Sequence, residues 1–289
     1  MVTTALRERM RSILRTRNYS PRTEKTYIDA VARFARHFGK SPDRLGAAQV
    51  IEYQIWLRES KHASATLTNQ VVCALKFLYC EVLGRPDEVG RIAYARTERR
   101  LPVVLSPEQV ARFLGSLSIH RYRVLFTTIY ATGLRISEAL GLRAEDIDSS
   151  RMVIRVRQGK GKKDRYVPLS PILLDLLRDH WRRERLTGFL FPSAKDRSRT
   201  LSAVNAQKYA VRASRQAGLQ VRVTARTLRH CYATHLLENG TSTRVVQVLL
   251  GHSDVHTTET YTHVSTQTIG KVVSPLDHIA GLLGEQRRE

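Results

Sequence analysis

Residues 249–264 read LLGHSDVHTTETYTHV, and this stretch is the most informative in the sequence. The apolar residues before Gly251 predict a short helix over about 243–250 that ends at this glycine. His252 follows at once, and a further candidate helix surrounds Tyr261. Considered alone, His252 would more often be structural than catalytic, and Tyr261 would most often be a half-buried packing residue. Whether His252 and Tyr261 have a catalytic role can be judged only together with other segments of the chain.

Three further segments have side chains suited to a phosphodiester. They read ATGLRISEALGL (131–142), QGKGKKDRYVPL (158–169) and TARTLRHCYATHLLENG (224–240). Arg135 follows a glycine that we expect to end a helix, and such an arginine is either a surface ion-pair partner or an anion ligand. Lys160 lies at a glycine-flanked hairpin tip, where a lysine is usually a solvated turn residue. Arg226 and Arg229 would share one face of a helix, where they repel unless an anion lies between them.

The four segments together resemble the signature motifs of the tyrosine recombinase family, which includes phage integrases, integron integrases and the recombinases that resolve chromosome dimers. The resemblance covers essentially all of residues 102–270, and residues 249–264 match the family pattern LLGH-S…TT-x-x-Y-x-H position by position. It implies a site-specific recombinase that cleaves and rejoins double-stranded DNA through a 3′-phosphotyrosine, and that integrates or excises a mobile element. It also implies a tetramer on two paired DNA sites.

Carried over by position, the resemblance implies the roles of the site residues. Arg135 and Arg229 would be the two arginines that clamp the phosphate, and Lys160 would be the lysine of the hairpin turn. His252 would be the histidine after the glycine, and Tyr261 would be the nucleophile. The guanidinium groups would stabilise charge on the phosphate oxygens, and Lys160 is the candidate acid for the leaving 5′-oxygen. Because the phosphotyrosine stores the bond energy, we expect no nucleotide, metal or other cofactor.

One position departs from the family pattern. The usual motif is H-x-x-R, but this chain has Arg226 before Arg229, and neither His230 nor His235 falls at the histidine position. Arg226 can donate to the same phosphate oxygen, so we include it among the catalytic residues, but it cannot accept a proton. The departure therefore bears on the rate more than on the type of reaction. It also leaves open a rival interpretation, a catalytically impaired DNA-binding regulator of the same fold.

Other interpretations explain less of the sequence. A type IB topoisomerase-like enzyme would share the chemistry and relax supercoils without site preference, and an RNA-binding module would leave the Tyr261 segment unexplained. H-x-x-x-H spacing suggests a zinc site whose candidate ligands are His252, Asp254, His256 and His263. We reject zinc because no second cysteine or glutamate ligand has a standard spacing, and the recombinase pattern already accounts for two of the histidines.

The charge of the chain agrees with a nucleic-acid partner. The 289 residues include 48 Lys and Arg against 26 Asp and Glu, a formal net charge of +22. Residues 1–100 have 19 basic and 10 acidic side chains, and residues 101–289 have 29 and 16. Both halves are basic, as expected if both lie against one polyanion, although a ribosome-type binder or a merely basic surface would share this composition.

Cysteine usage and hydropathy predict where the protein works. The three cysteines form no C-x-x-C pair and cannot all pair within the chain, which fits a reduced cytosol. No apolar run approaches the roughly 18 residues of a membrane span, and the N-terminus lacks the apolar core of a signal peptide. We expect a cytoplasmic, nucleoid-associated protein that does not contact a membrane.

Helical periodicity predicts a mainly α fold in two domains. Residues 1–84 are expected to form a helical domain, which resembles the family's core-binding (SAM-like) domain, and the aperiodic, charged stretch 85–101 an interdomain linker. Residues 102–289 are expected to form the catalytic domain, helical with a small antiparallel β-sheet whose strands lie at about 152–157 and 165–169.

Helix start and stop signals locate the elements. Ser20-Pro21 and Gly39 delimit one predicted helix, and Ser106 opens another with the spacing of a capping box. Besides the helix after Ser20-Pro21, helices are expected at about 3–17, 47–59, 63–83, 107–117 (after Ser106), 121–131, 171–185, 202–217, 227–239 and 243–250.

An apolar stripe marks the end of the chain. Leu276, Ile279, Ala280 and Leu283 follow helical spacing after a Ser-Pro start, which predicts a C-terminal helix over 274–285. A helix this short needs a partner surface, because it cannot stand alone in water. Two alternatives remain open: the helix folds back onto its own domain or, as the resemblance implies, docks into a neighbouring protomer.

Overall fold

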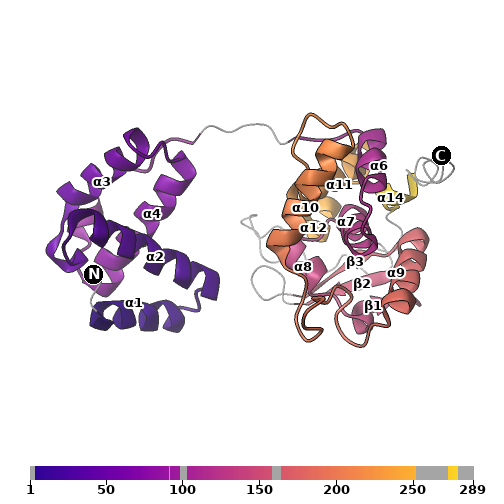
Figure 1. Cartoon of the computed structure of the whole chain (residues 1–289), viewed down its shortest axis with the longest axis horizontal. Helices are drawn as coiled ribbons and strands as arrows, with labels where there is room; N and C mark the ends of the chain where they lie inside the picture. Colours follow the sequence, from indigo (N-terminus) through magenta and orange to yellow (C-terminus); the bar gives the residue numbers. More distant parts are fainter. Residues whose placement is uncertain (1–3, 91, 98–102, 158–163, 252–272, 279–289) are drawn as a thin grey trace. The chain divides into compact units, whose positions relative to one another are not determined.

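The computed structural model describes residues 4–90, 92–97, 103–157, 164–251 and 273–278 (Figure 1). The chain divides into two compact units, residues 1–100 and 101–289, each with its own hydrophobic core. Both are built mainly from helices, and the second contains a small antiparallel sheet, so the predicted fold class is confirmed. None of the helices in these described ranges is long and apolar enough to cross a membrane.

The N-terminal unit is a bundle of helices. They are α1 (Thr4–Thr16), α2 (Pro21–Phe38), α3 (Ala47–Glu59), α4 (Ala65–Phe77) and α5 (Asp87–Gly90), with a 3-10 turn η1 (Pro42–Arg44) and a π-helical turn η2 (Leu78–Val82). Helix α2 begins and ends as predicted, because the Ser20 side chain accepts a hydrogen bond from the Thr23 amide (3.1 Å) and Gly39 is left-handed (φ +63°). The helix predicted over 63–83 is present, but its last turn is π-helical.

The N-terminal core extends beyond residue 84. Val89 and Ile92 are 0% and 4% exposed and belong to the same core as α2 and α4. Asn69 of α4 holds the residues that follow, because its side chain donates to the carbonyl of Ala95 (2.9 Å) and accepts from the Ala95 amide (2.7 Å). The described residues in the first part of the expected linker, 85–90 and 92–95, therefore pack on the N-terminal unit. The few apolar side chains of this stretch are too scattered to give a periodic pattern.

The C-terminal unit surrounds a buried central helix. Its helices are α6 (Pro107–Gly115), α7 (His120–Thr132), α8 (Ile136–Leu140), α9 (Pro171–Glu184), α10 (Ala203–Gln216), α11 (Ala225–Glu238), α12 (Thr243–Leu250) and α14 (Pro275–His278), with a 3-10 turn η3 (Ala144–Asp146). Every residue of α7 from Val124 to Thr132 is buried, and α7 packs against α6, α8, α9, α11 and α14 (Figure 1). The turn at the C-terminal end of α7 forms part of the candidate site.

A three-stranded antiparallel sheet completes the unit. Its strands are β1 (Ile147–Asp148), β2 (Val153–Val156) and β3 (Arg165–Pro168), in the order β1-β2-β3. Val156 lies opposite Arg165, and the two predicted strands are confirmed as β2 and β3. Neither β1 nor the five-residue helix α8 is among the elements predicted from the sequence, because each spans fewer than two periods of its own pattern.

The end of the chain begins by folding back onto its own unit. Ser274 Oγ donates to the carbonyl of Ala131 in α7 (2.9 Å), and Leu276 is fully buried in the core of this unit. The described part of the helix predicted over 274–285 is α14; Ile279, Ala280 and Leu283 lie outside the described residues. The fold-back alternative therefore holds for Leu276.

Candidate active site

Helix α7 ends in a turn that leads into the site. Gly133 is left-handed (φ +65°) and caps α7. A Cβ at this position would lie 2.4 Å from Cδ1 and 2.6 Å from Cε1 of Tyr232, so the close approach of the helix end to this ring requires glycine. The turn places Arg135 at the N-cap of α8, where its amide donates to the Glu138 side chain.

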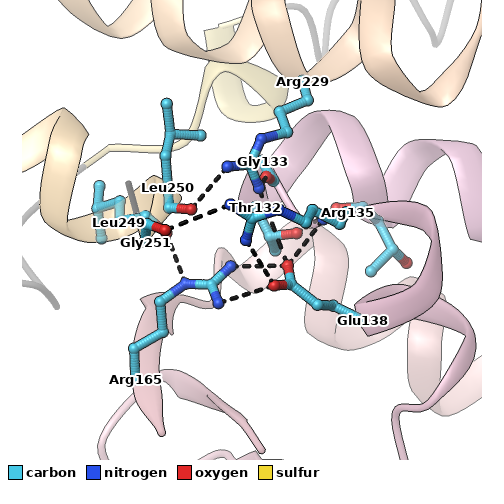
Figure 2. Close-up of polar contacts among 10 residues, drawn as sticks. Thr132, Gly133, Arg135, Glu138, Arg165, Arg229, Leu249, Leu250 and Gly251 are labelled. Atoms are coloured by element: carbon cyan, nitrogen blue, oxygen red, sulfur yellow. Dashed lines mark hydrogen bonds and ion pairs between the residues drawn. The ribbon is translucent and has the colours of Figure 1, made fainter. Parts of the chain in front are cut away.

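Glu138 is the centre of a group of arginine side chains (Figure 2). Its carboxylate accepts hydrogen bonds from the amide and from Nη1 of Arg135, both at 2.8 Å. It also accepts a forked hydrogen bond from Arg165, with Nη1 at 3.0 Å and Nη2 at 2.8 Å. Arg229 Nη1 lies 3.8 Å from Glu138 Oε2. We call Arg135, Glu138, Arg165 and Arg229 the arginine cluster.

Arg229, on α11, is a buried cation of the cluster. Its side chain is 10% exposed, and it donates through Nη1 to the carbonyl of Gly133 (2.7 Å) and through Nη2 to that of Leu250 (2.6 Å). Burial and the charges of the neighbouring arginines lower the pKa of Arg229, Glu138 raises it, and the net result is a pKa of about 10. The guanidinium group still keeps its charge at neutral pH.

The other two arginines hold the end of α12. Arg165 Nε donates to the carbonyl of Leu249 (2.9 Å), and Arg135 Nη2 donates to that of Gly251 (3.3 Å). Carbonyl groups at a helix C-terminus lack partners within the helix, so cations are favoured there. Gly251 is left-handed (φ +61°), and a Cβ there would lie 3.2 Å from Cδ and Nε of Arg165. The glycine thus lets the guanidinium approach the backbone directly before His252.

The cluster has an excess of positive charge. Burial raises the pKa of Glu138, but the hydrogen bond and charge of Arg165 and the hydrogen bonds of Arg135 outweigh it and lower the pKa to about 2. Three guanidinium groups and one carboxylate give the cluster a formal charge of +2. The Arg135 side chain is 29% exposed, so this charge is accessible to a ligand. An anion with several oxygens, such as a phosphodiester, matches these donors.

Arg226 lies in the first turn of α11, three residues before Arg229, and is exposed. Its Nε donates to Nε2 of His230 (3.3 Å). Burial lowers the pKa of His230, and the charges of Arg226 and Arg229 lower it further, so this histidine is neutral at pH 7 and accepts the bond. The structure therefore brings Arg135 and Arg229 together around Glu138, whereas Arg226 is exposed and bonds to His230 on the same helix.

Three predicted site residues, Lys160, His252 and Tyr261, lie outside the described residues. In the sequence, Lys160 belongs to the segment that joins β2 to β3, and His252 directly follows Gly251. The segment with the rejected zinc ligands lies outside the described residues as well. Among the residues that are described, no group of three or more His, Cys, Asp or Glu is placed to hold a metal ion.

Glu138 and Arg165 are not among the site residues predicted from the sequence. Glu138 lies three residues after Arg135, a spacing at which a helix brings opposite charges together, so this pair could have been found. Arg165 bonds to Glu138 across 27 positions and to Leu249 across 84. No local pattern in a single sequence indicates such contacts.

Known proteins that resemble this chain agree with its fold and motifs. The model of the phage integrase family matches residues 103–268, and that of the phage integrase N-terminal SAM-like domain matches residues 6–88. The chain is 42% identical over 283 residues to the putative integrase/recombinase y4qK of Sinorhizobium fredii. This alignment covers 96% of this chain and 90% of that protein. The chain is also 35% identical over 270 residues to the tyrosine recombinase XerA of Thermococcus kodakarensis, with coverage of 92% and 93%.

A solved structure shares the architecture. It is the crystal structure of a lambda integrase(75-356) dimer bound to a COC' core site, with a TM-score of 0.69, 20% identity, and coverage of 88% of this chain and 96% of that one. At this identity the likeness concerns the fold alone. The family model that spans the arginine cluster and the relatives that align over nearly the whole chain lead to one conclusion: the chain belongs to the phage integrase family of tyrosine recombinases.

Proposed function

We propose that the protein cleaves and rejoins double-stranded DNA at specific sites, with Tyr261 as the nucleophile. The observation that carries the proposal is the arginine cluster, whose net positive charge lies at the backbone directly before His252. The Tyr261 oxygen attacks phosphorus, the bond from phosphorus to the 5′-oxygen breaks, and the products are a 3′-phosphotyrosine and a 5′-hydroxyl group. The 5′-hydroxyl group of a second DNA end then reverses this step on a new partner.

The other site residues support the transfer of the phosphate. Arg135 and Arg229 donate to the non-bridging oxygens, where negative charge gathers in the transition state. Lys160 protonates the leaving 5′-oxygen. His252 and Arg226 complete the contacts to the phosphate, and Arg226 acts as a donor only, because a guanidinium group cannot accept a proton. The surrounding positive charges favour the phenolate form of the nucleophile, whose proton passes to solvent.

The substrate we propose is the pair of ends of a mobile element, which the protein integrates or excises as a tetramer on paired sites. The net charge of +22 supports a DNA partner, because the basic side chains are spread over both units. The relative from Sinorhizobium fredii is named an integrase/recombinase, and the lambda integrase structure holds a dimer on a DNA core site.

Trapping of a covalent adduct tests the function. The protein is mixed with duplexes taken from the DNA that flanks its gene, each with a nick that lets the cleaved strand diffuse away, and DNA-linked protein is detected after denaturation. We expect an adduct with the wild-type protein and none with Tyr261→Phe, which loses only the nucleophilic oxygen and still binds DNA. Recombinants at a comparable rate from the Phe variant would exclude Tyr261 as nucleophile.

The same experiment separates the rival functions. A DNA-binding regulator would shift the duplexes in a gel without forming an adduct on any of them. A topoisomerase-like enzyme would form adducts at unrelated sequences and relax any supercoiled plasmid. Adducts confined to one flanking sequence are the result that we expect for a site-specific recombinase.

A further inference from the structure

We propose that Arg165 is a positioning residue of the active site, which fixes the place of Arg135 and of the backbone that precedes His252. This inference rests on the proposed function, because it assigns Arg165 a task in the same site. Arg165 is the first residue of β3 and follows the segment that contains Lys160. Its side chain is 11% exposed, so its interactions are made inside the protein.

One guanidinium group connects three segments of the chain. Arg165 extends from β3, its two Nη atoms bond to both oxygens of Glu138 on α8, and its Nε bonds to the carbonyl of Leu249 in the last turn of α12. The donors of a guanidinium group lie in one plane at fixed angles. A movement of α8 or of the end of α12 relative to β3 would therefore break at least one of these bonds.

Glu138 links the position of Arg135 to that of Arg165. The same carboxylate that accepts the fork from Arg165 accepts the amide and Nη1 of Arg135. Its side chain is 6% exposed, which leaves little room for water to replace a lost partner. The orientation of the Arg135 guanidinium toward a phosphate thus depends on a carboxylate that Arg165 holds in place.

Arg165 also restricts the position of Gly251. The absence of a side chain lets this residue lie against Arg165, because an added Cβ would approach its Cδ, Nε and Cζ to 3.2–3.3 Å. The Gly251 carbonyl also accepts a hydrogen bond from Arg135 Nη2 (3.3 Å). Arg165 therefore lies against the glycine that caps α12 and holds the backbone directly before His252.

Three variants separate positioning from charge. Arg165→Lys keeps the positive charge, but a single ammonium group cannot reproduce the fork to Glu138 together with the bond to Leu249. Arg165→Gln removes the charge as well. The matched control is Arg155→Gln on the neighbouring strand β2, because Arg155 is 50% exposed and bonds to Asp164 (2.8 Å) rather than to the cluster.

The first measurement is single-turnover adduct formation at saturating protein, with DNA affinity and melting temperature alongside. We expect Arg165→Lys to slow adduct formation about 10²-fold, since a misplacement of about 1 Å can cost that much, while its affinity changes less than about twofold because many basic residues share DNA binding. Arg155→Gln should keep the wild-type rate. A near-wild-type rate for Arg165→Lys overturns the positioning role, whereas a wild-type protein without any adduct overturns the proposed function instead.

The second measurement is the pH profile. The charged groups that face Glu138 are Arg135 at the N-cap of α8, Arg165 of β3 and Arg229 of α11. Arg165→Gln removes the partner that contributes most to lowering the pKa of Glu138, so that pKa rises and acidification releases Arg135. Its adduct formation should fall more steeply on acidification than that of the wild type. The double variant Glu138→Gln/Arg165→Gln lacks this titration and should lose the additional slope; equal slopes in all three proteins overturn the proposal.

Hydrogen exchange gives a readout that needs no cleavage. In Arg165→Lys, backbone amides of α8 and of the last turn of α12 should exchange faster than in the wild type, because both segments lose the same partner. Arg155→Gln should leave both segments unchanged. Unchanged exchange in α8 and α12 of Arg165→Lys overturns the proposal, even for a protein that cuts no DNA.

Discussion

Tyr130 and His235 form a buried hydrogen bond, with 2.9 Å between the tyrosine hydroxyl and Nδ1 of the imidazole. Nε2 of the same ring lies 2.9 Å from the carbonyl of Leu105, and because a carbonyl only accepts, Nε2 has the hydrogen and Nδ1 accepts from Tyr130. His235 is 5% exposed. Both nitrogens are therefore used within the fold, and this histidine does not supply the proton acceptor that Arg226 lacks.

Tyr130→Phe should lower stability and leave the chemistry intact. The variant leaves the buried Nδ1 of His235 without its donor, which costs about 1–3 kcal/mol in free energy of unfolding. Urea denaturation measures this loss, and adduct formation at saturating protein should match the wild type. A slower chemical step at unchanged stability would contradict the structural role of this pair.

Gly133→Ala should cost more stability than Gly218→Ala. Both glycines are left-handed, with φ of +65° and +68°, so alanine adds about 1–2 kcal/mol of backbone strain at either position. Only at Gly133 does the new Cβ also meet the Tyr232 ring; at Gly218 nothing lies within 4 Å. We expect a further loss of about 1–3 kcal/mol for Gly133→Ala, measured by urea denaturation. Equal losses would show that the ring moves aside at no cost.

Arg135→Ala and Arg229→Ala should each slow the chemical step about 10²–10³-fold, as the loss of an oxyanion donor does in comparable sites. Arg229→Ala should also lower the melting temperature, because it removes a buried group that bonds two helix-end carbonyls, whereas the Arg135 side chain is 29% exposed. Non-specific DNA affinity should change far less, since many basic residues share it. Normal cleavage at saturating protein, with only affinity reduced, would exclude a role in the transition state.

Mild acid should destabilise the fold through its buried histidines. Burial lowers the pKa of His180, although its hydrogen bond to the Leu190 carbonyl opposes this, and burial also lowers the pKa of the adjacent His120. The unfolded state therefore binds protons more readily, and stability falls as the pH drops below about 6.5. The contribution of Glu138, whose pKa is lowered, is present above its ordinary pKa of 4.5 and is lost only at lower pH.

His180→Gln tests this assignment. Glutamine keeps a donor for the Leu190 carbonyl, which lies 2.9 Å from His180 Nε2, and removes the ionisation. The fall in free energy of unfolding between about pH 8 and about pH 5.5 should be smaller than in the wild type. It should not vanish, because burial lowers the pKa values of His120 and His230 as well. An identical fall in both proteins would contradict the role of His180.

Signals that act within one helical turn could be predicted from the sequence. Ser106 and Gln109 form the expected capping box, with the Ser106 amide 3.0 Å from the Gln109 side chain and the Gln109 amide 3.3 Å from the Ser106 hydroxyl. Motif resemblance selected Arg135 and Arg229, which the structure brings together around one carboxylate. The roles of the site residues remain predictions that the adduct experiments test.

Contacts between distant segments could not be predicted in this way. In the sequence, nothing distinguishes Arg165 from an exposed residue at the start of a strand. Only the fold brings Glu138 and Leu249 beside it. Val89 and Ile92 fall in a charged stretch without periodicity, and only tertiary packing shows that they are buried. These side chains are specified by partners far away in the sequence, and a pattern of fixed spacing cannot indicate such partners.

The chain on both sides of Tyr261 is attached to one unit, since the Gly251 carbonyl is held by Arg135 and the Ser274 hydroxyl bonds to Ala131. Tyr261 is ten residues from Gly251, and a chain of this length reaches at most about 36 Å. The covalent chain therefore keeps Tyr261, the proposed nucleophile, within this reach of Gly251, at an effective concentration that does not depend on the amount of protein. After a complex has assembled on DNA, dilution should leave the first strand cut unaffected, and only the encounter of two DNA sites should depend on the amount of protein.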